Sequence, residues 1–169
     1  NDLAFLVASR AAGALGAYPV RVNWHFQSDE VGYVLRDCEA KVLVAHGDLL
    51  AGVEAAVPRG VTVLGVRTPP ELRVAYGLGE AAGSLPGAAR EWEPWLAQSP
   101  PRDEPAAAPP GAMLYTGGTT GRPKGVRYRR PSAAQAEGMA AMRAAVYGIR
   151  PGMRTVIAAP LYHSAPFSY

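Results

Sequence analysis

Cysteine, lysine and long apolar runs are scarce or missing in this sequence. Cys38 is the only cysteine among 169 residues, so no disulfide can form within the chain, and we expect a reducing compartment. The sequence has no run of about 18 apolar residues, and no charged start followed by a short apolar segment and a cleavage site. We therefore expect neither a transmembrane segment nor a signal peptide, and a cytoplasmic location.

The charge of the chain is small and dispersed. The formal net charge is +3 at pH 7, and the only basic cluster consists of Arg127, Arg129 and Arg130. Recognition of nucleic acid needs a denser basic patch, so we expect no nucleic-acid partner. The hydrophobic content of 49% over 169 residues is enough for one compact domain with its own core.

Helical and strand patterns alternate along the chain. Apolar residues at helical spacing predict helices over 1–15, from Ser28 onward, after Asp48, and over 131–147, with Ser28 and Asp48 as N-caps. Short apolar runs predict strands at 18–22, 41–45, 61–66, 112–115, 125–129 and 154–159. This alternation indicates an α/β fold with layered, parallel-leaning sheets and flanking helices.

We divide the chain into three parts, 1–66, 67–110 and 111–169. Nine prolines fall in the middle part and apolar periodicity is weak there, so it is expected to be a surface connection. Its tryptophans would anchor a short helical turn on the body. In the last part, Met139 and Met142 are expected to pack in the core.

The segment 113–126 combines glycine, threonine and lysine and contains no acidic residue. An apolar strand leads into a loop whose backbone N–H groups, threonine hydroxyls and lysine are donors suited to a polyphosphate. Glycine alone is weak evidence, because plain tight turns are also rich in glycine. The spacing also differs from the Walker pattern, because Arg122 and Pro123 separate Gly121 from Lys124. The candidate nucleotide-binding residues are Thr116, Gly117, Gly118, Thr119, Thr120, Gly121 and Lys124, and we assign no metal ligand.

The run 116–125 resembles the signature loop of the adenylate-forming superfamily, which includes acyl-CoA synthetases, luciferases and peptide-synthetase adenylation domains. Gly117 stands where many members have serine, so one hydroxyl donor of the family pattern is missing. Further along, residues 160–163 resemble the Pro-aromatic/Leu-aromatic-His pattern of acyl-CoA synthetases. The opening third, including 13–24 and 40–44, is similar to fatty-acid and related acid-CoA ligases, so the resemblance covers nearly the whole chain.

This resemblance implies that the chain is part of the large N-terminal domain of an enzyme that joins a carboxylic acid to coenzyme A. In that reaction the carboxylate attacks ATP to give an acyl-adenylate and pyrophosphate, Mg²⁺ shares the phosphate charge, and the thiol of coenzyme A then takes the acyl group. By resemblance, residues 116–121 and Lys124 would hold the β and γ phosphates, and His163 would lie beside the acid. The family's metal-binding Glu, ribose-binding Asp and catalytic Lys segments are not in the sequence, so we expect a truncated piece without full activity.

Three alternatives stay open. The chain could come from an amino-acid adenylation domain, or it could be a noncatalytic nucleotide-binding or interaction module that keeps the loop. His163 could be a loop histidine that bonds to the backbone. An incomplete sheet exposes its edges, so we also expect either association, for example as a homodimer, or limited stability.

Overall fold

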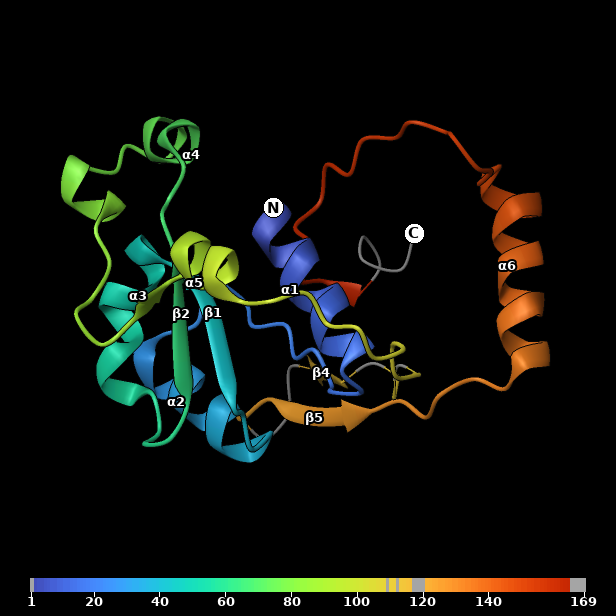
Figure 1. Ribbon diagram of the computed structural model, residues 1–169, viewed down its shortest axis with the longest axis horizontal. Helices are drawn as coiled ribbons and strands as arrows, with labels where there is room; N and C mark the ends of the chain where they lie inside the picture. Colours follow the sequence, from blue (N-terminus) through green and yellow to red (C-terminus); the bar gives the residue numbers. More distant parts are fainter. Residues whose placement is uncertain (1, 109, 112, 117–120, 165–169) are drawn as a thin grey trace.

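The computed structural model describes residues 2–108, 110–111, 113–116 and 121–164. Figure 1 shows two separate sheets joined by helices and loops. The elements in chain order are α1 (Leu3–Ala14), α2 (Ser28–Asp37), β1 (Val42–His46), α3 (Gly47–Val53), the 3₁₀ helix η1 (Glu54–Ala56), β2 (Thr62–Val66), α4 (Pro70–Ala75), the 3₁₀ helix η2 (Glu80–Gly83), β3 (Arg90–Glu91), α5 (Trp92–Gln98), β4 (Met113–Thr116), β5 (Lys124–Arg127) and α6 (Ala133–Tyr147).

The first sheet is parallel and has the strand order β1-β2-β3. β1 pairs with β2 from Val42 opposite Thr62 to His46 opposite Val66, and β2 pairs with β3 at Leu64 opposite Arg90. β2 is the central strand, which accounts for its nearly continuous apolar sequence. The predicted α/β fold with a parallel sheet and flanking helices is confirmed.

The middle part of the chain differs from the prediction. Residues 67–110 were expected to be a surface connection, but they supply the third parallel strand and helices α4 and α5. Trp92, at the start of α5, is 6% exposed and packs with Leu64 and Val66 of the central strand, so the predicted helical turn anchored by tryptophan is confirmed. This part of the chain therefore contributes to the core.

The core lies on both faces of the parallel sheet, because successive strand residues point to opposite faces. On one face, Leu43 packs with Val31 and Leu35 of α2 and with Leu50 of α3. On the other face, Trp92 and Leu64 pack with Ala4 and Ala8 of α1. Asp2 Oδ1 accepts a hydrogen bond from the Leu3 N–H at 2.6 Å, and Asp2 Oδ2 is hydrogen-bonded to His46 Nε2 at 2.8 Å. Asp2 therefore fixes α1 at the end of β1.

The second sheet is an antiparallel pair, β4 with β5. The expectation of parallel-leaning sheets therefore holds for the first sheet and not for this one. The predicted strand 18–22 is reduced to one parallel bridge, between Val20 and Met113; Pro19, which lacks an N–H donor, fits this shortening. The predicted strand 154–159 is wrong, because these residues, all of them described, have no regular secondary structure.

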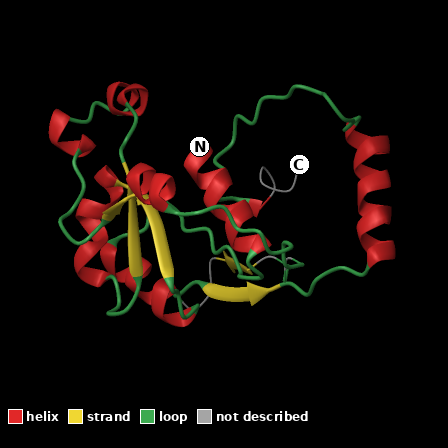
Figure 2. Cartoon of the chain, viewed as in Figure 1, coloured by secondary structure: helices red, strands yellow, loops and turns green. Residues whose placement is uncertain are grey.

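Helix α6 begins as predicted and packs differently. The Ser132 hydroxyl accepts a hydrogen bond from the Gln135 N–H at 3.2 Å, and the Gln135 side chain accepts one from the Ser132 N–H at 2.9 Å, so both groups cap the helix. Met139 and Met142 are 42% and 47% exposed, so the prediction that they pack in the core is wrong. Figure 2 shows α6 apart from both sheets. Among the described residues, no helix is long and apolar enough to cross a membrane.

Candidate active site

The β4–β5 hairpin carries the described part of the predicted phosphate loop. Thr116 ends β4 and Lys124 begins β5, and the two residues are directly opposite each other in the sheet. Cross-strand partners lie on the same face of the sheet. Both residues are exposed. The strands therefore bring a hydroxyl and an ammonium group together at the mouth of the loop, although these two residues are eight positions apart in the sequence.

Gly121 is the only one of the three loop glycines that the structure describes. Its φ is +87°, a backbone conformation that residues with a Cβ atom rarely adopt. Among the described residues, an added Cβ would meet no atom within 4 Å. Gly121 is therefore needed for its conformation. The predicted residues Gly117, Gly118, Thr119 and Thr120 lie outside the described residues.

Two contacts near the loop join the hairpin to helix α2, and each involves a tyrosine. Tyr115, the last residue before Thr116, donates a hydrogen bond from its hydroxyl to Asp37 Oδ2 at 2.5 Å. Burial, and then the hydrogen bond to Asp37, hold the pKa of the Tyr115 hydroxyl well above its usual range, so it keeps its proton at neutral pH. On the other side, the guanidinium carbon of Arg122 lies 5.4 Å from the centre of the Tyr33 ring.

Gly125 makes room for Tyr115. The two residues are opposite each other in the hairpin, and a Cβ at Gly125 would lie 3.0 Å from the Tyr115 hydroxyl and 2.9 Å from the end of the Met113 side chain. A larger residue at position 125 would therefore displace the tyrosine that bonds to Asp37.

His163 lies in a turn that a buried arginine holds. The N–H of His163 donates to the carbonyl of Pro160 at 3.2 Å. Arg21 Nη1 donates to the carbonyl of His163 at 3.1 Å and, with a longer contact of 3.5 Å, to that of Leu161. Arg21 is 9% exposed and Leu161 is 5% exposed, and burial lowers the pKa of the Arg21 guanidinium from its usual value. The His163 side chain itself is exposed, with its ring centre 4.2 Å from that of Tyr162.

The segment 18–21 contacts both candidate parts of the site. Val20 pairs with Met113 of β4, and the Tyr18 ring lies 5.6 Å from the guanidinium carbon of Arg127 on β5. The next residue, Arg21, bonds to the His163 turn. The structure thus gives the hairpin and the His163 turn a shared neighbour. Sequence reasoning gave Arg21 no role, although a charged residue between Val20 and Val22 in a predicted strand was a signal for one.

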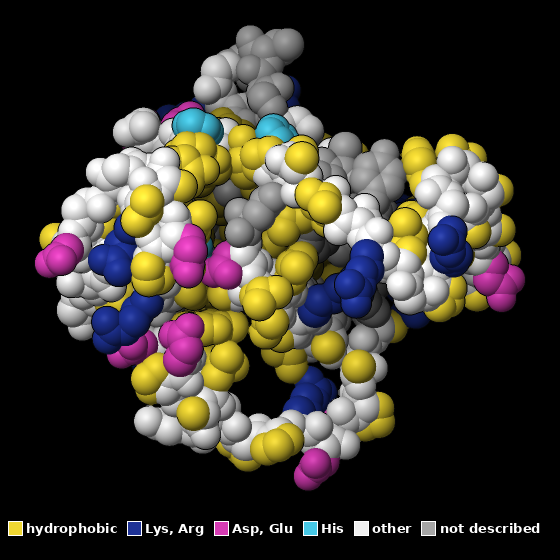
Figure 3. Space-filling view, turned by 90° about the horizontal axis from the view of Figure 1, so that it is seen from above, with side chains coloured by type: hydrophobic (Ala, Val, Ile, Leu, Met, Phe, Trp, Pro, Cys, Tyr) yellow, Lys and Arg dark blue, Asp and Glu magenta, His cyan; other side chains and the backbone are white. Residues whose placement is uncertain are grey.

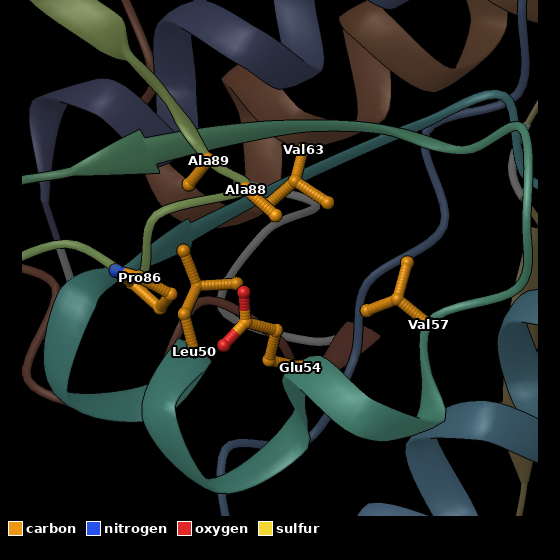
Figure 4. Close-up of a pocket in the computed structure, with 7 residues that line it drawn as sticks. All are labelled: Leu50, Glu54, Val57, Val63, Pro86, Ala88 and Ala89. Carbon is orange, nitrogen blue, oxygen red and sulfur yellow. The ribbon is translucent and has the colours of Figure 1, made fainter.

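The described residues outside this site show dispersed charge and a small apolar pocket. Among the described residues, no group of three or more His, Cys, Asp or Glu side chains could hold a metal ion. Figure 3 shows the face seen from above Figure 1, where Lys and Arg side chains are spread among Asp and Glu side chains. This agrees with the dispersed charge of the sequence. Figure 4 shows a small pocket against α3 and β2, lined mostly by apolar residues: Leu50, Glu54, Val57, Val63, Pro86, Ala88 and Ala89. None of them is a predicted site residue.

Comparison with known proteins identifies the family. The family model described as AMP-binding enzyme matches residues 1–169. The chain belongs to the AMP-binding enzyme family. The resemblance to adenylate-forming enzymes that the loop and residues 160–163 suggested is therefore confirmed.

Several acid-CoA ligases are similar to this member of the family. The chain is 32% identical over 133 residues to the medium-chain acyl-CoA ligase Mig of Mycobacterium avium, a match covering 77% of the chain and 22% of the relative. It is 32% identical over 134 residues to the 3-oxocholest-4-en-26-oate–CoA ligase of Rhodococcus rhodochrous, covering 76% and 22%. It is 28% identical over 174 residues to the long-chain-fatty-acid–CoA ligase FadD13 of Mycobacterium tuberculosis, covering 98% and 29%.

A solved structure is also similar. The anthranilate CoA ligase AuaEII in complex with anthranoyl-AMP is 27% identical, with a TM-score of 0.49, over 69% of this chain and 21% of that chain. The chain spans between 22% and 29% of the length of the curated relatives it matches.

Proposed function

We propose that this chain belongs to an ATP-dependent acid-CoA ligase and supplies the part that holds the ATP phosphates. In the first step, a carboxylate oxygen of the acid attacks the α-phosphorus of ATP, and pyrophosphate leaves. In the second step, the sulfur of coenzyme A attacks the acyl carbon of the acyl-adenylate, and AMP leaves. The observation that carries the proposal is the hairpin that places Thr116 opposite Lys124, in a chain whose whole length matches the AMP-binding family.

The chemistry of the loop suits phosphate. Negative charge shifts onto the leaving pyrophosphate during the first step, so fixed N–H donors, hydroxyls and a cation stabilise the transition state more than they stabilise free ATP. We assign this role to residues 116–121 and Lys124. We assign Mg²⁺ to the phosphates of ATP, whose charge it shares.

We place His163 beside the acid and the adenylate. Its exposed side chain sits on a turn whose carbonyl is bonded to Arg21, and the neighbouring Val20 pairs with the strand that leads into the loop. Its backbone contacts also suit the alternative, a structural loop histidine. The relatives are named for medium-chain and long-chain fatty acids and for a steroid acid. We therefore propose an aliphatic or steroid carboxylic acid as the substrate and coenzyme A as the acceptor.

The proposal is tested by acid-dependent exchange of pyrophosphate into ATP. The full-length protein is incubated with ATP, Mg²⁺, labelled pyrophosphate and either a medium-chain fatty acid, a long-chain fatty acid, a steroid acid or the common amino acids, and thioester formation with coenzyme A is then measured. We expect exchange with one class of non-amino acid and a thioester product. Exchange with amino acids alone would indicate an adenylation domain, and ATP binding without any exchange would indicate a noncatalytic module.

The isolated chain of 169 residues is a useful comparison in the same assay. Because the matches cover only 22% and 29% of the length of two relatives, we expect it to catalyse no acid-dependent exchange. Acid-dependent exchange by the isolated chain would overturn the expectation that these 169 residues lack full activity.

A further inference from the structure

We infer that one face of helix α2, formed by Tyr33 and Asp37, holds the end of the β4–β5 hairpin in place from both sides of the phosphate loop. The functional meaning of this inference rests on the proposed role of the loop in ATP binding. The inference itself concerns the hairpin and can be tested without ATP.

The two contacts come from one helix face. Tyr33 and Asp37 are four residues apart in α2, and residues at this spacing are neighbours on a helix surface. Asp37 accepts the hydrogen bond from the Tyr115 hydroxyl at 2.5 Å, across 78 positions of sequence. Tyr33 presents its ring to the guanidinium of Arg122 at 5.4 Å.

The two partners lie on opposite sides of the loop. Tyr115 precedes Thr116 at the end of β4, and Arg122 follows Gly121 shortly before β5 begins at Lys124. A contact on only one side would fix only one of the two chain segments that flank the loop. The two contacts together tie both segments, before Thr116 and after Gly121, to the same helix.

Helix α2 is firmly fixed to the body. Val31 and Leu35 are 6% and 4% exposed and pack in the core with Leu43 and Leu50. Gly32 is also tightly packed, because an added Cβ would lie 3.0 Å from the carbonyl oxygen of Ala56. The helix therefore transmits the position of the parallel sheet to the hairpin.

The hydrogen bond from Tyr115 suits a permanent support. The acceptor is a carboxylate, and hydrogen bonds to charged acceptors are stronger than those between neutral groups. Gly125 leaves the tyrosine the space it needs across the hairpin. Burial and this bond raise the pKa of the Tyr115 hydroxyl, so it stays a donor at neutral pH.

The test uses amide hydrogen exchange in the full-length protein, read by mass spectrometry. The variants are Tyr115→Phe, Asp37→Asn and the double variant for one side of the loop, and Tyr33→Leu for the other. Tyr76→Phe and Asp103→Asn are matched controls, because both residues are exposed and neither contacts the hairpin in any described interaction. Peptides covering 62–66 of the central strand serve as an internal reference for correct folding.

We expect peptides covering 113–116 and 121–127 to exchange about fivefold faster in Tyr115→Phe, as the loss of one net hydrogen bond implies. Tyr33→Leu removes the contact between ring and guanidinium, and exchange there should rise about threefold. The double variant should exchange no faster than Tyr115→Phe, because Tyr115→Phe alone already removes the bond. Asp37→Asn should have a smaller effect, because its amide oxygen still accepts a weaker hydrogen bond. The reference peptides and both controls should match the wild type. Unchanged exchange at the hairpin, or an additive effect in the double variant, would overturn the inference.

Equilibrium binding of ATP with Mg²⁺ to the same variants separates this inference from the proposed function. Faster exchange at the hairpin with a Kd for ATP raised about fivefold supports both. Faster exchange with an unchanged Kd supports the holding role of α2 and contradicts the assignment of the loop to ATP. A raised Kd with unchanged exchange contradicts the inference and leaves the assignment of the loop standing.

Discussion

Arg21 connects two ends of the chain. Its guanidinium donates to the carbonyl of His163, 142 positions later, and the side chain is buried. A buried guanidinium must keep its hydrogen bonds, because an unpaired charge in the interior is costly. We therefore attribute to Arg21 the position of the turn that carries His163.

Replacing Arg21 tests this positioning role. We expect Arg21→Met to lower kcat for acid-dependent pyrophosphate exchange about tenfold in the full-length protein, because one or more charge-assisted hydrogen bonds are lost. The Kd for ATP should change less than twofold, since the hairpin is held by other contacts. Arg21→Lys, which keeps the charge and one donor direction, should recover part of the rate. Arg10→Met, on an exposed position of α1, is the control, and equal kinetics for Arg21→Met and this control would contradict the assignment.

Cys38 gives a prediction about reactivity and pH. Burial raises the pKa of its thiol, and the thiol also contacts the carbonyl of Leu35 at 3.8 Å. The thiolate is the reactive form, so we expect Cys38 to react with a disulfide reagent at pH 8 at least about tenfold more slowly in the folded protein than in urea. Because the pKa of the thiol is raised in the folded state, its contribution to the free energy of unfolding is fully present at a pH below the usual pKa of a thiol. This contribution disappears as the pH rises through the pKa of the thiol in the folded protein. Equal rates in the folded and unfolded protein would contradict this.

At the level of elements, periodic segments could be predicted and short ones could not. Helices α1, α2 and α6 and strands β1 and β2 follow from apolar spacing, to within about two residues at their ends. The caps were less predictable: Gln27 precedes α2 and donates its N–H to Glu30 at 2.8 Å, so Ser28 is the first helical residue and not the cap. Asp48 lies inside the first turn of α3 and accepts from the Thr68 hydroxyl at 2.5 Å.

Strand β3 shows why residues 67–110 were misread. The strand has only two residues, which is too short for any periodicity. It forms because the edge of β2 is free to pair and because Trp92 fixes the following helix in the core. One signal was available: Gly65 lies in β2, and an added Cβ there would lie 2.7 Å from Leu85, so the glycine marks the close approach of this segment.

Trp92 allows a test of this corrected role for the middle part. We expect Trp92→Ala to lower the free energy of unfolding by about 3–5 kcal/mol, because a buried aromatic ring is lost and a cavity remains. Trp24→Ala, where the tryptophan is 43% exposed, should cost much less. Urea denaturation of the two variants measures the difference. A cost below about 1 kcal/mol for Trp92→Ala would mean that this part only lies on the surface, as the proline content suggested.

The orientation of the β4–β5 pair could have been predicted. The residues between these strands, 117–123, are too few for the crossover that parallel strands need, so two adjacent strands joined this closely must be antiparallel. The pairing of Thr116 with Lys124 then follows, and with it half of the candidate site. The contacts of Tyr33, Asp37 and Arg21 could not be predicted, because each joins residues more than 70 positions apart.

At the scale of the whole molecule, the parallel sheet is a support and the hairpin carries the candidate chemistry. Helix α2 packs into the core below one face of the sheet and contacts the hairpin with its other side. Segment 18–21 joins the hairpin to the His163 turn. The chain belongs to the AMP-binding family over all its residues, while its activity as an acid-CoA ligase, its association as a homodimer and its cytoplasmic location stay predictions.

The central claim is that the β4–β5 hairpin holds the ATP phosphates. Its most direct test is to replace Lys124 or Lys41, the two lysines of this chain, and to measure the affinity of the full-length protein for ATP with Mg²⁺. Lys124 begins β5 at the mouth of the loop, and Lys41 is an exposed residue just before β1, so Lys41→Ala removes the same charge at a distant place. We predict that Lys124→Ala raises the Kd for ATP at least about tenfold, as expected for a charge-assisted bond to phosphate, and that Lys41→Ala leaves it within about twofold. Equal affinities in the two variants would contradict the assignment of this hairpin to the ATP phosphates.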